Sequence, residues 1–248
     1  MMPSASTYFT QGNITCQYDE NLIADFSADM LSADYWQQRD SITGSAQGRG
    51  TTWFIRYVAP QAQGVEHNWV LRHYYRGGLI GKLIKDSYLF TGIENTRAAK
   101  EYALLEHMQT LNLPAPKPVA CRVTRTGLFY QADLLSTRIE NAQDLVAILS
   151  KQTLNEALWQ QIGATIKRFH DNGIYHHDLN AHNILLNDKA RVFIIDFDRG
   201  EQRPVQATWQ QANMARLKRS FEKELNQLEQ FHYNEQNWQQ LLHGYQEK

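Results

Sequence analysis

The stretch GIYHHDLNAHNILLN at residues 173–187, followed by VFIIDFD at residues 192–198, decides the fold. It places Asp178 behind two histidines, Asn183 five positions later, and Asp196 at the end of a short apolar run. Two runs rich in branched apolar residues, NILLN and RVFIID, are joined by a short turn-like link, which is typical of a two-strand hairpin. The sequence therefore predicts a loop that carries Asp178 and Asn183, and a hairpin that returns the chain to Asp196.

Asp178, Asn183 and Asp196 form a set that suits the transfer of a phosphoryl group to a hydroxyl. One acid can orient the attacking hydroxyl and accept its proton, while an amide oxygen and a second carboxylate can hold Mg²⁺ over the phosphates of ATP. We therefore predict Asp178 as the catalytic base, and Asn183 and Asp196 as the metal ligands. The spacing from His176 through these residues is that of the catalytic loop and metal-binding segment of kinases.

Bulk composition excludes several classes of protein. The 248 residues carry a formal net charge of -1, without the basic excess of a nucleic-acid binder, so no nucleic-acid partner is expected. Cys16 and Cys121 lie in no metal-binding spacing, which favours a reducing compartment. The first residues lack the basic and apolar parts of a signal peptide, and no apolar run is long enough to cross a bilayer. Any membrane contact is therefore expected to be peripheral.

The first half of the chain mixes predicted strands with one helix. Residues 51–58 and 67–75 are rich in aromatic and β-branched residues and are separated by proline and glycine, which predicts a hairpin. Apolar residues at three- and four-residue steps predict a helix that is capped by Asn95 or Thr96 and ends before Pro114. Two further strands, VACRV and GLFYQADLL, complete this half.

The second half of the chain is predicted to be mostly helical. A polar stretch at residues 136–141 precedes it as a hinge. An apolar stripe from Leu154 to Phe169 predicts a helix with Gly173 as its C-terminal cap. From about Pro204 to the end, apolar residues again recur at helical steps. Their positions are Leu217, Phe221, Leu225, Leu228 and Phe231.

The order of these features resembles the protein-kinase-like superfamily over most of the chain. The resemblance implies an α+β, bilobal fold, with a nucleotide-binding lobe at residues 1–135 and a mainly helical catalytic lobe at residues 136–248. The first lobe should hold a small antiparallel sheet and one helix. The resemblance also implies a strand cation that binds the α- and β-phosphates of ATP and pairs with a glutamate of the next helix. Arg72 stands where the family usually has lysine, and Glu101 suits the partner.

Glycines precede the first predicted strand in the run GSAQGRG, residues 44–50. The run resembles the glycine-rich phosphate loop of kinases, although its spacing departs from GxGxxG. The resemblance implies that Gly48, Arg49 and Gly50 bind ATP. A glycine run before a strand is also typical of a simple turn, and this alternative stays open.

Several of these residues have a structural explanation beside the functional one. His176 is expected to hydrogen-bond the backbone and brace its loop, because Asp178 already fills the role of the base. Glu94 and Glu106 compete with Glu101 as the partner of the strand cation. The apolar stripe places Glu101 nearer the buried edge of its helix, which favours it.

The acceptor is predicted from the end of the chain. The segment after Asp196 is short, without an APE-like anchor or a recognisable activation loop, and Asp198 replaces the third residue of the DFG motif. Both features favour a small-molecule or glycan kinase. Residues 69–90 together with IIDFDRG resemble the 3-deoxy-D-manno-octulosonic acid (Kdo) kinases of Gram-negative bacteria. The resemblance implies that ATP phosphorylates the 4-hydroxyl of Kdo on Kdo-lipid IVA in lipopolysaccharide core synthesis, at the cytoplasmic face of the inner membrane.

A basic stretch fits such an acceptor. Arg76, Lys82 and Lys85 follow Arg72 in a chain of nearly zero net charge, and are expected to bind the anionic, lipid-linked sugar. Ordinary solubilising surface is the alternative. Two other functions stay open: a kinase of another acceptor, such as heptose or an aminoglycoside, and a pseudokinase that binds nucleotide without catalysis. The oligomeric state is left open.

Overall fold

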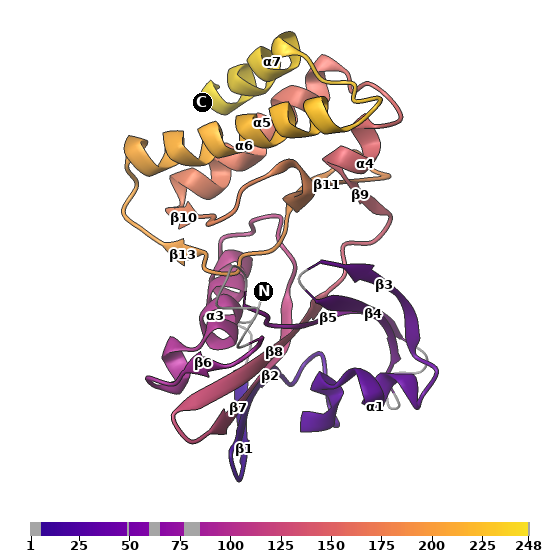
Figure 1. The fold of residues 1–248 in the computed structure, drawn as a ribbon, viewed down its shortest axis with the longest axis vertical. Coiled ribbons are helices and arrows are strands. Elements are labelled where there is room, and N and C mark those ends of the chain that lie inside the picture. The colour runs from indigo at the N-terminus through magenta and orange to yellow at the C-terminus, as the bar shows by residue number, and fades with distance from the viewer. Residues whose placement is uncertain (1–5, 49, 60–64, 77–84, 248) are drawn as a thin grey trace. The chain divides into compact units, whose positions relative to one another are not determined.

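The chain folds into two compact units, which Figure 1 traces by their helices and strands. The first unit is Met1–Glu106 with Pro116–Arg138, and the second is His107–Ala115 with Ile139–Lys248. The computed structural model describes residues 6–48, 50–59, 65–76 and 85–247.

The sequence predicted a single boundary between residues 135 and 136. The structure divides the chain differently, because the earlier segment His107–Ala115 belongs to the second unit. Its carbonyl groups explain the placement. Arg168 Nη2 donates to the carbonyl oxygen of Asn112 at 2.9 Å, and the N–H of Ile194 donates to that of Pro114 at 3.0 Å.

An antiparallel sheet of eight strands forms most of the first unit (Figure 1). Its order is β1-β2-β7-β8-β5-β4-β3, and β6 pairs with β8. The bounds are β1 (Ser6–Gln11), β2 (Ile14–Asp19), β3 (Ile42–Gln47), β4 (Thr51–Val58), β5 (Glu66–His73), β6 (Tyr88–Leu89), β7 (Pro118–Thr126) and β8 (Phe129–Thr137). The predicted hairpin is confirmed as β4 and β5, which pair Thr52 with Arg72. The strands β1, β2, β3 and β6 were not predicted.

The helix predicted in the first half of the chain is α3, and it begins where the apolar pattern indicated. The helices are η1 (Ala28–Leu31), α1 (Ala33–Gln37), η2 (Ile93–Asn95) and α3 (Arg97–Thr110). The hydroxyl oxygen of Thr96 accepts a hydrogen bond from the N–H of Ala99 at 3.4 Å, so the predicted capping residue is confirmed. The short α1 was missed, because five residues carry no readable periodicity.

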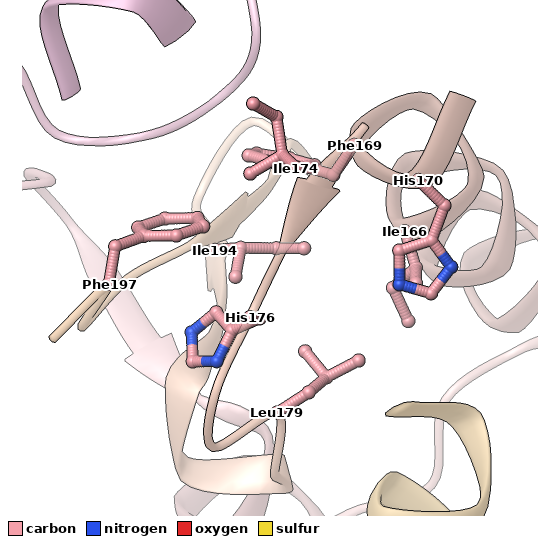
Figure 2. A pocket seen from close by; sticks show the side chains of 8 residues that line it. All are labelled: Ile166, Phe169, His170, Ile174, His176, Leu179, Ile194 and Phe197. Carbon is pink, nitrogen blue, oxygen red and sulfur yellow. The ribbon is translucent and has the colours of Figure 1, made fainter. Parts of the chain in front are cut away.

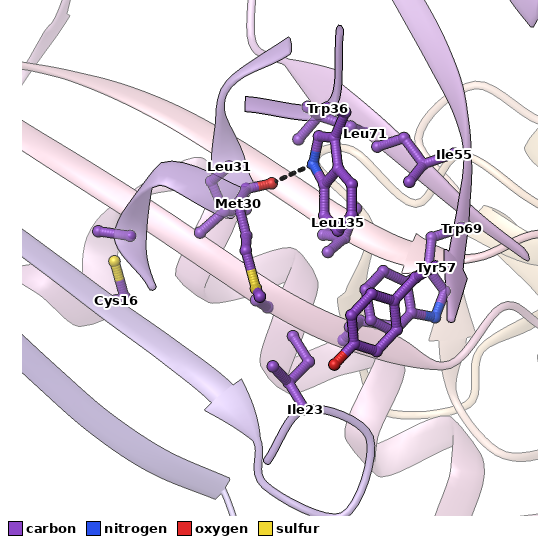
Figure 3. Close-up of a cluster of buried hydrophobic side chains, with 13 residues drawn as sticks. Cys16, Ile23, Met30, Leu31, Trp36, Ile55, Tyr57, Trp69, Leu71 and Leu135 are labelled. Carbon is purple, nitrogen blue, oxygen red and sulfur yellow. Dashed lines mark hydrogen bonds between the residues drawn. The ribbon is translucent and has the colours of Figure 1, made fainter. Parts of the chain in front are cut away.

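Aliphatic side chains and the rings of Trp36, Tyr57 and Trp69 form a core cluster in the first unit (Figure 3). Trp69 stacks on Tyr57 with ring centres 4.5 Å apart, and Trp36 meets Trp69 edge-on at 6.0 Å. Trp36 Nε1 donates to the carbonyl oxygen of Met30 at 2.6 Å, which satisfies the polar atom of this buried indole. Since the cluster includes side chains of β4 and β5, it fixes the strand that carries Arg72.

Helices form most of the second unit (Figure 1). They are α4 (Leu145–Leu149), α5 (Glu156–Asp171), η3 (Ala181–Asn183), α6 (Ala207–Gln227) and α7 (Glu235–Gln246). The strands are β9 (Ala142–Asp144), β10 (Ile174–Tyr175), β11 (Ile184–Asn187), β12 (Val192–Ile194) and β13 (Glu201–Gln202). The predicted hairpin of NILLN and RVFIID is confirmed as β11 and β12. The α+β fold class is thereby confirmed, with a sheet-bearing unit and a mainly helical one.

The helix α5 has the ends that its sequence predicts. Asn155 Oδ1 accepts from the N–H of Leu158 at 2.9 Å, and Gly173 ends the helical segment with φ of 71°. Two glycines allow α5 and α7 to approach closely. A Cβ at Gly163 would lie 2.0 Å from a backbone oxygen of α7, and a Cβ at Gly244 would lie 2.0 Å from one of α5.

The predicted helical stripe at the C-terminal end is wrong in its last part. The helix α6 ends at Gln227, and Leu225 and Leu228 are exposed although the pattern placed them on the packed side. Phe231 is buried, but in the segment between α6 and α7. Asn234 then starts α7 through a capping box, so a second helix replaces the continuous one.

Candidate active site

The imidazole of His176 joins the two segments that carry the predicted acids. Its Nδ1 accepts a hydrogen bond from the N–H of Asp178 at 3.1 Å, and its Nε2 lies 2.9 Å from the carbonyl oxygen of Ile195, the residue before Asp196. Since Nδ1 accepts, Nε2 carries the proton and donates. Burial lowers the pKa of His176 and so favours this neutral tautomer. The prediction that His176 braces its loop is confirmed.

Asn183 closes the loop of residues 176–183. Its Nδ2 donates to the carbonyl oxygen of Asp178 at 3.0 Å, and its own carbonyl oxygen accepts from the N–H of Ile195 at 3.0 Å. Asn180 begins the short η3 helix, because its Oδ1 accepts from the N–H of Asn183 at 3.2 Å. The structure therefore brings Asp178, Asn183 and the segment of Asp196 together within the second unit.

Asp196 follows β12 in a left-handed backbone conformation, with φ of 62°. This region is uncommon for a residue with a side chain, and it turns the chain sharply after the strand. Phe197 is then buried and stacks on Phe169 with ring centres 5.6 Å apart. Figure 2 shows Phe197 and His176 beside one small cavity of about 10 Å³, which has room for one water molecule at most. The burial of Phe197 anchors the neighbouring Asp196.

The predicted Mg²⁺ ligands have suitable chemistry. Because the Nδ2 of Asn183 is committed to a backbone carbonyl, its Oδ1 is the end of the amide that can bind a cation. Amide and carboxylate oxygens are the hard ligands that Mg²⁺ prefers. Within the described residues, no group of three or more His, Cys, Asp or Glu side chains could hold a metal ion. Mg²⁺ is usually bound by only one or two protein carboxylates together with waters and phosphate oxygens.

One stripe of α6 supports the 176–183 loop, and sequence reasoning missed it. The amide of Asn213 bonds both backbone groups of His176, and Ser220 Oγ accepts from the N–H of Ala181 at 3.0 Å. The stripe that contacts the loop consists of Asn213, Arg216, Ser220 and Glu224. The sequence did hold a signal for this stripe, because its polar residues recur at helical spacing within an apolar pattern.

Arg216 reaches the predicted base itself. Its Nη1 donates to Asp178 Oδ1 at 3.2 Å, and the two side chains are 46% and 48% exposed. Asp178 Oδ2 accepts no hydrogen bond from any residue that the structure describes. One carboxylate oxygen is thus oriented by the protein, and the other remains available to a ligand.

In the first unit, the structure brings Arg72 and Glu101 together. Arg72 Nη2 donates to both carboxylate oxygens of Glu101 at 2.6 Å. The hydroxyl of Tyr74 donates to Glu101 Oε2 at 2.6 Å, and burial, with the adjacent Glu101 charge, raises the pKa of Tyr74 well above its usual value. Tyr74 was missed, although its two-residue step from Arg72 along a strand was a readable signal.

The glycine run forms the end of β3 and the turn into β4. The N–H of Gly48 donates to the carbonyl oxygen of Gly50 at 3.0 Å. A Cβ at Gly50 would lie 2.0 Å from the ring of Tyr75, whereas the nearest atom to a Cβ at Gly48 is 3.8 Å away. Arg49 lies outside the described residues. This tight contact explains on steric grounds why position 50 is a glycine. The explanation applies equally if the run is a simple turn or a phosphate loop.

The basic stretch after β5 has structural contacts of its own. Arg76 Nε donates to the carbonyl oxygen of Ser87 at 2.5 Å, and its guanidinium lies 4.9 Å from the ring centre of Tyr88. The backbone N–H of Arg76 donates to the carbonyl oxygen of Lys85 at 2.6 Å. Lys85 is exposed, and Lys82 lies outside the described residues. Two hydrogen bonds and one cation–π contact therefore account for the position of Arg76.

Comparisons with known proteins identify the family of the chain. The profile of the lipopolysaccharide kinase (Kdo/WaaP) family matches residues 33–245. The chain is 46% identical to the 3-deoxy-D-manno-octulosonic acid kinase of Vibrio parahaemolyticus over 93% of each protein, and 48% identical to that of Photobacterium damsela subsp. piscicida over 90% of each. A solved kinase, PK-1 of Cydia pomonella granulovirus, matches with a TM-score of 0.43 and 17% identity, over 71% of this chain and 58% of that one. From the family match and these relatives, the chain belongs to the lipopolysaccharide kinase (Kdo/WaaP) family.

Proposed function

We propose that this chain transfers the γ-phosphoryl group of ATP to the 4-hydroxyl of Kdo on Kdo-lipid IVA, in lipopolysaccharide core synthesis. The observation that carries the proposal is the pair of bonds from His176 to the backbone of Asp178 and Ile195, because they hold the proposed base beside the segment of Asp196. Family membership supports kinase activity, and the names of the relatives support Kdo as the acceptor.

In the proposed reaction, the oxygen of the acceptor hydroxyl bonds to the γ-phosphorus while the bond to the β–γ bridging oxygen breaks. Asp178 orients the hydroxyl through its available Oδ2 and accepts its proton. Asn183 Oδ1 and the carboxylate of Asp196 would hold Mg²⁺, which when bound neutralises charge on the phosphates. His176 orients both segments and stays neutral, since burial lowers its pKa.

Contacts in the first unit support a role for Arg72 in binding the nucleotide. A guanidinium keeps its charge at any physiological pH and can bind phosphate oxygens with two N–H groups at once. Glu101 holds one end of this guanidinium, and Tyr74 fixes the carboxylate that does so. We further propose that the turn with Gly48, Arg49 and Gly50 contacts the phosphates of ATP, and that Arg76, Lys82 and Lys85 bind the anionic acceptor.

The test is an acceptor assay with purified protein, labelled ATP and Kdo-lipid IVA, with and without Mg²⁺. The wild type should incorporate phosphate at the Kdo 4-hydroxyl, as located by phosphorus NMR, and Asp178→Ala should lower the rate by about 10³-fold or more, the scale expected for removal of a catalytic base. Equal incorporation by wild type and Asp178→Ala would remove Asp178 from the mechanism. Incorporation into heptose but not into Kdo would reassign the acceptor.

We also propose a peripheral position at the cytoplasmic face of the inner membrane. No helix in the described part of the chain combines the length and the apolarity that a membrane span requires. An apolar tip in the first unit supports surface contact. Leu128 is 69% exposed, Leu89 and Phe129 are exposed next to each other on β6 and β8, and Arg125 stacks over Phe90 at 4.6 Å. Apolar side chains beside a cation suit the headgroup region of an anionic bilayer.

Flotation with lipid vesicles tests this position. The wild type should float with vesicles that contain anionic phospholipid, and the double substitution Leu128→Ser with Phe129→Ser should reduce the bound fraction. Val205→Ser is the matched control, because Val205 is exposed in the second unit, away from the tip in sequence. Equal binding by the tip variant and the wild type would exclude this tip as the contact.

A further inference from the structure

Arg216 differs from its neighbours on the α6 stripe in what it contacts. Asn213 and Ser220 bond backbone groups of the 176–183 loop, whereas Arg216 donates to the carboxylate of Asp178. Both members of this ion pair are about half exposed, and exposed ion pairs contribute little to the stability of a fold. Stability is therefore an insufficient reason for a guanidinium at the proposed base.

Most N–H groups of the Arg216 guanidinium are not engaged by the described residues. The guanidinium carries five N–H groups in a planar fork, and in the part of the chain that the structure describes only the bond to Asp178 Oδ1 engages it. On the other side of the pair, Asp178 Oδ2 is available to a ligand. When the hydroxyl of a ligand hydrogen-bonds to Asp178 Oδ2, the N–H groups of Arg216 lie close to it. An anionic group of the same ligand can then accept hydrogen bonds from Arg216.

We propose that Arg216 forms an anion subsite for the carboxylate of the acceptor sugar acid. This inference rests on the proposed function and names the group by which the acceptor is recognised. In Kdo the carboxylate is attached to C2, two ring carbons from the C4 that bears the reacting hydroxyl, so one sugar ring presents both groups to one Arg216–Asp178 pair. A carboxylate matches the planar fork of a guanidinium in two-pronged fashion, which a lysine does not reproduce.

The subsite makes Arg216 a specificity-determining residue. When the acceptor binds, its carboxylate engages the unused N–H groups while the bond to Asp178 Oδ1 keeps the base oriented. With a neutral sugar, the unused N–H groups of Arg216 stay hydrated and no charge-assisted pair forms. The kcat/KM for a neutral sugar should therefore be about 10- to 100-fold lower than for the sugar acid. The enzyme should therefore favour ulosonic acids over neutral sugars of similar shape.

The test compares two acceptors, Kdo-lipid IVA and the same lipid with the Kdo carboxyl reduced to a primary alcohol. Wild type, Arg216→Ala, Arg216→Lys and Arg219→Ala are assayed for kcat/KM after thermal unfolding shows that each is folded. Arg219→Ala is the matched control, because it removes the same charge from an exposed position of the same helix and so reproduces any general attraction for an anionic lipid.

We expect wild type and Arg219→Ala to prefer the natural acceptor by about 10- to 100-fold in kcat/KM. Arg216→Ala should lose this preference: kcat/KM should fall with both acceptors, because the bond to Asp178 is lost, but about 10- to 100-fold further with the natural acceptor. Arg216→Lys should retain part of the preference. A loss that is equal for both acceptors would show that Arg216 only positions Asp178 and would overturn the subsite. Wild-type protein that phosphorylates neither acceptor would overturn the proposed function together with the subsite.

Discussion

The side-chain amide of Asn213 pairs with both backbone groups of His176: Nδ2 donates to the carbonyl oxygen at 3.0 Å, and Oδ1 accepts from the N–H at 3.3 Å. Both residues are buried. Because the ring of His176 in turn holds Asp178 and Ile195, the amide of Asn213 on α6 contributes to the position of both segments. The packing of a C-terminal helix is thereby linked to the proposed chemistry.

Asn213→Ala should destabilise the protein and lower kcat together. Two buried backbone groups would lose their partners, at a cost of about 1–3 kcal/mol in the free energy of unfolding. The loop would then hold Asp178 less firmly, so kcat should fall by more than the KM for ATP rises. Urea denaturation and steady-state kinetics measure the two effects. Gln211→Ala, at an exposed position of the same helix, is the control, and an Asn213→Ala variant with wild-type kcat would contradict this argument.

Glu101→Gln should destabilise the first unit more than Tyr74→Phe. The carboxylate of Glu101 accepts from Arg72 and from Tyr74, so its loss leaves a partly buried guanidinium without its counter-charge, at about 3 kcal/mol. Tyr74→Phe removes one charge-assisted hydrogen bond, about 1.5 kcal/mol. The KM for ATP should rise in Glu101→Gln, if Arg72 binds phosphate.

Glu94→Gln is the matched control for that comparison, because Glu94 is exposed in η2, just before α3, and competed with Glu101 in the sequence pattern. Chemical denaturation and ATP titration of the three variants check the order. If Glu94→Gln lost as much stability and ATP affinity as Glu101→Gln, the loss of any negative charge near α3, and not the loss of the Arg72–Glu101 pair, would explain both effects.

Gly50→Ala should raise the KM for ATP through a steric effect on Tyr75. The new methyl group would lie 2.0 Å from the ring, so the turn or the ring must move. Gly48→Ala has no such neighbour and should have a smaller effect. The combination of Gly50→Ala with Tyr75→Ala removes the obstructing ring and should recover most of the affinity. Failure of that recovery, with all variants folded, would place the role of Gly50 in its backbone and not in this contact.

The site could be predicted where its contacts are local. His176, Asp178 and Asn183 are joined by hydrogen bonds that span two and five residues, and such short spacings leave a readable motif. The strand and helix that present Arg72 and Glu101 each carry a clear periodicity. The hairpin of β11 and β12 follows from a turn between two short apolar runs.

The contacts from α6 could not be predicted, because their partners are distant in sequence. Asn213 and Arg216 lie 37 and 38 positions from the residues they bond, and no local pattern encodes which loop a polar residue of a helix will contact. Leu225 and Leu228 show the opposite error. Their spacing continues the apolar stripe, but a helical period cannot reveal where the packing partner ends.

Asp196→Asn should raise the Mg²⁺ concentration needed for half-maximal rate. Replacement of a carboxylate by an amide removes a full negative charge from a proposed ligand, and Mg²⁺ binds carboxylate oxygens more strongly than amide oxygens. Asp198→Asn is the informative comparison, since Asp198 lies two residues further along the same turn. Rates measured over a Mg²⁺ titration distinguish them. A larger shift for Asp198→Asn than for Asp196→Asn would move the proposed ligand to Asp198.

Two buried histidines should make the second unit less stable in acid. Burial lowers the pKa of His170 from its ordinary 6.5 to about 4 and also lowers the pKa of His176. Between these values the unfolded chain binds protons that the folded chain does not, so stability is complete above pH 6.5 and falls as the pH drops towards 4.

For His170 the loss on going from pH 6.5 to a pH of about 5 should be about 2 kcal/mol, and His176 should add a loss of the same sign. Urea denaturation at a series of pH values measures it. His170→Gln removes one titrating group and should flatten the dependence, whereas His243→Gln, at an exposed position on α7, should leave these two groups in place and the slope nearly unchanged. An unchanged slope in His170→Gln would show that the acid sensitivity arises from groups other than His170.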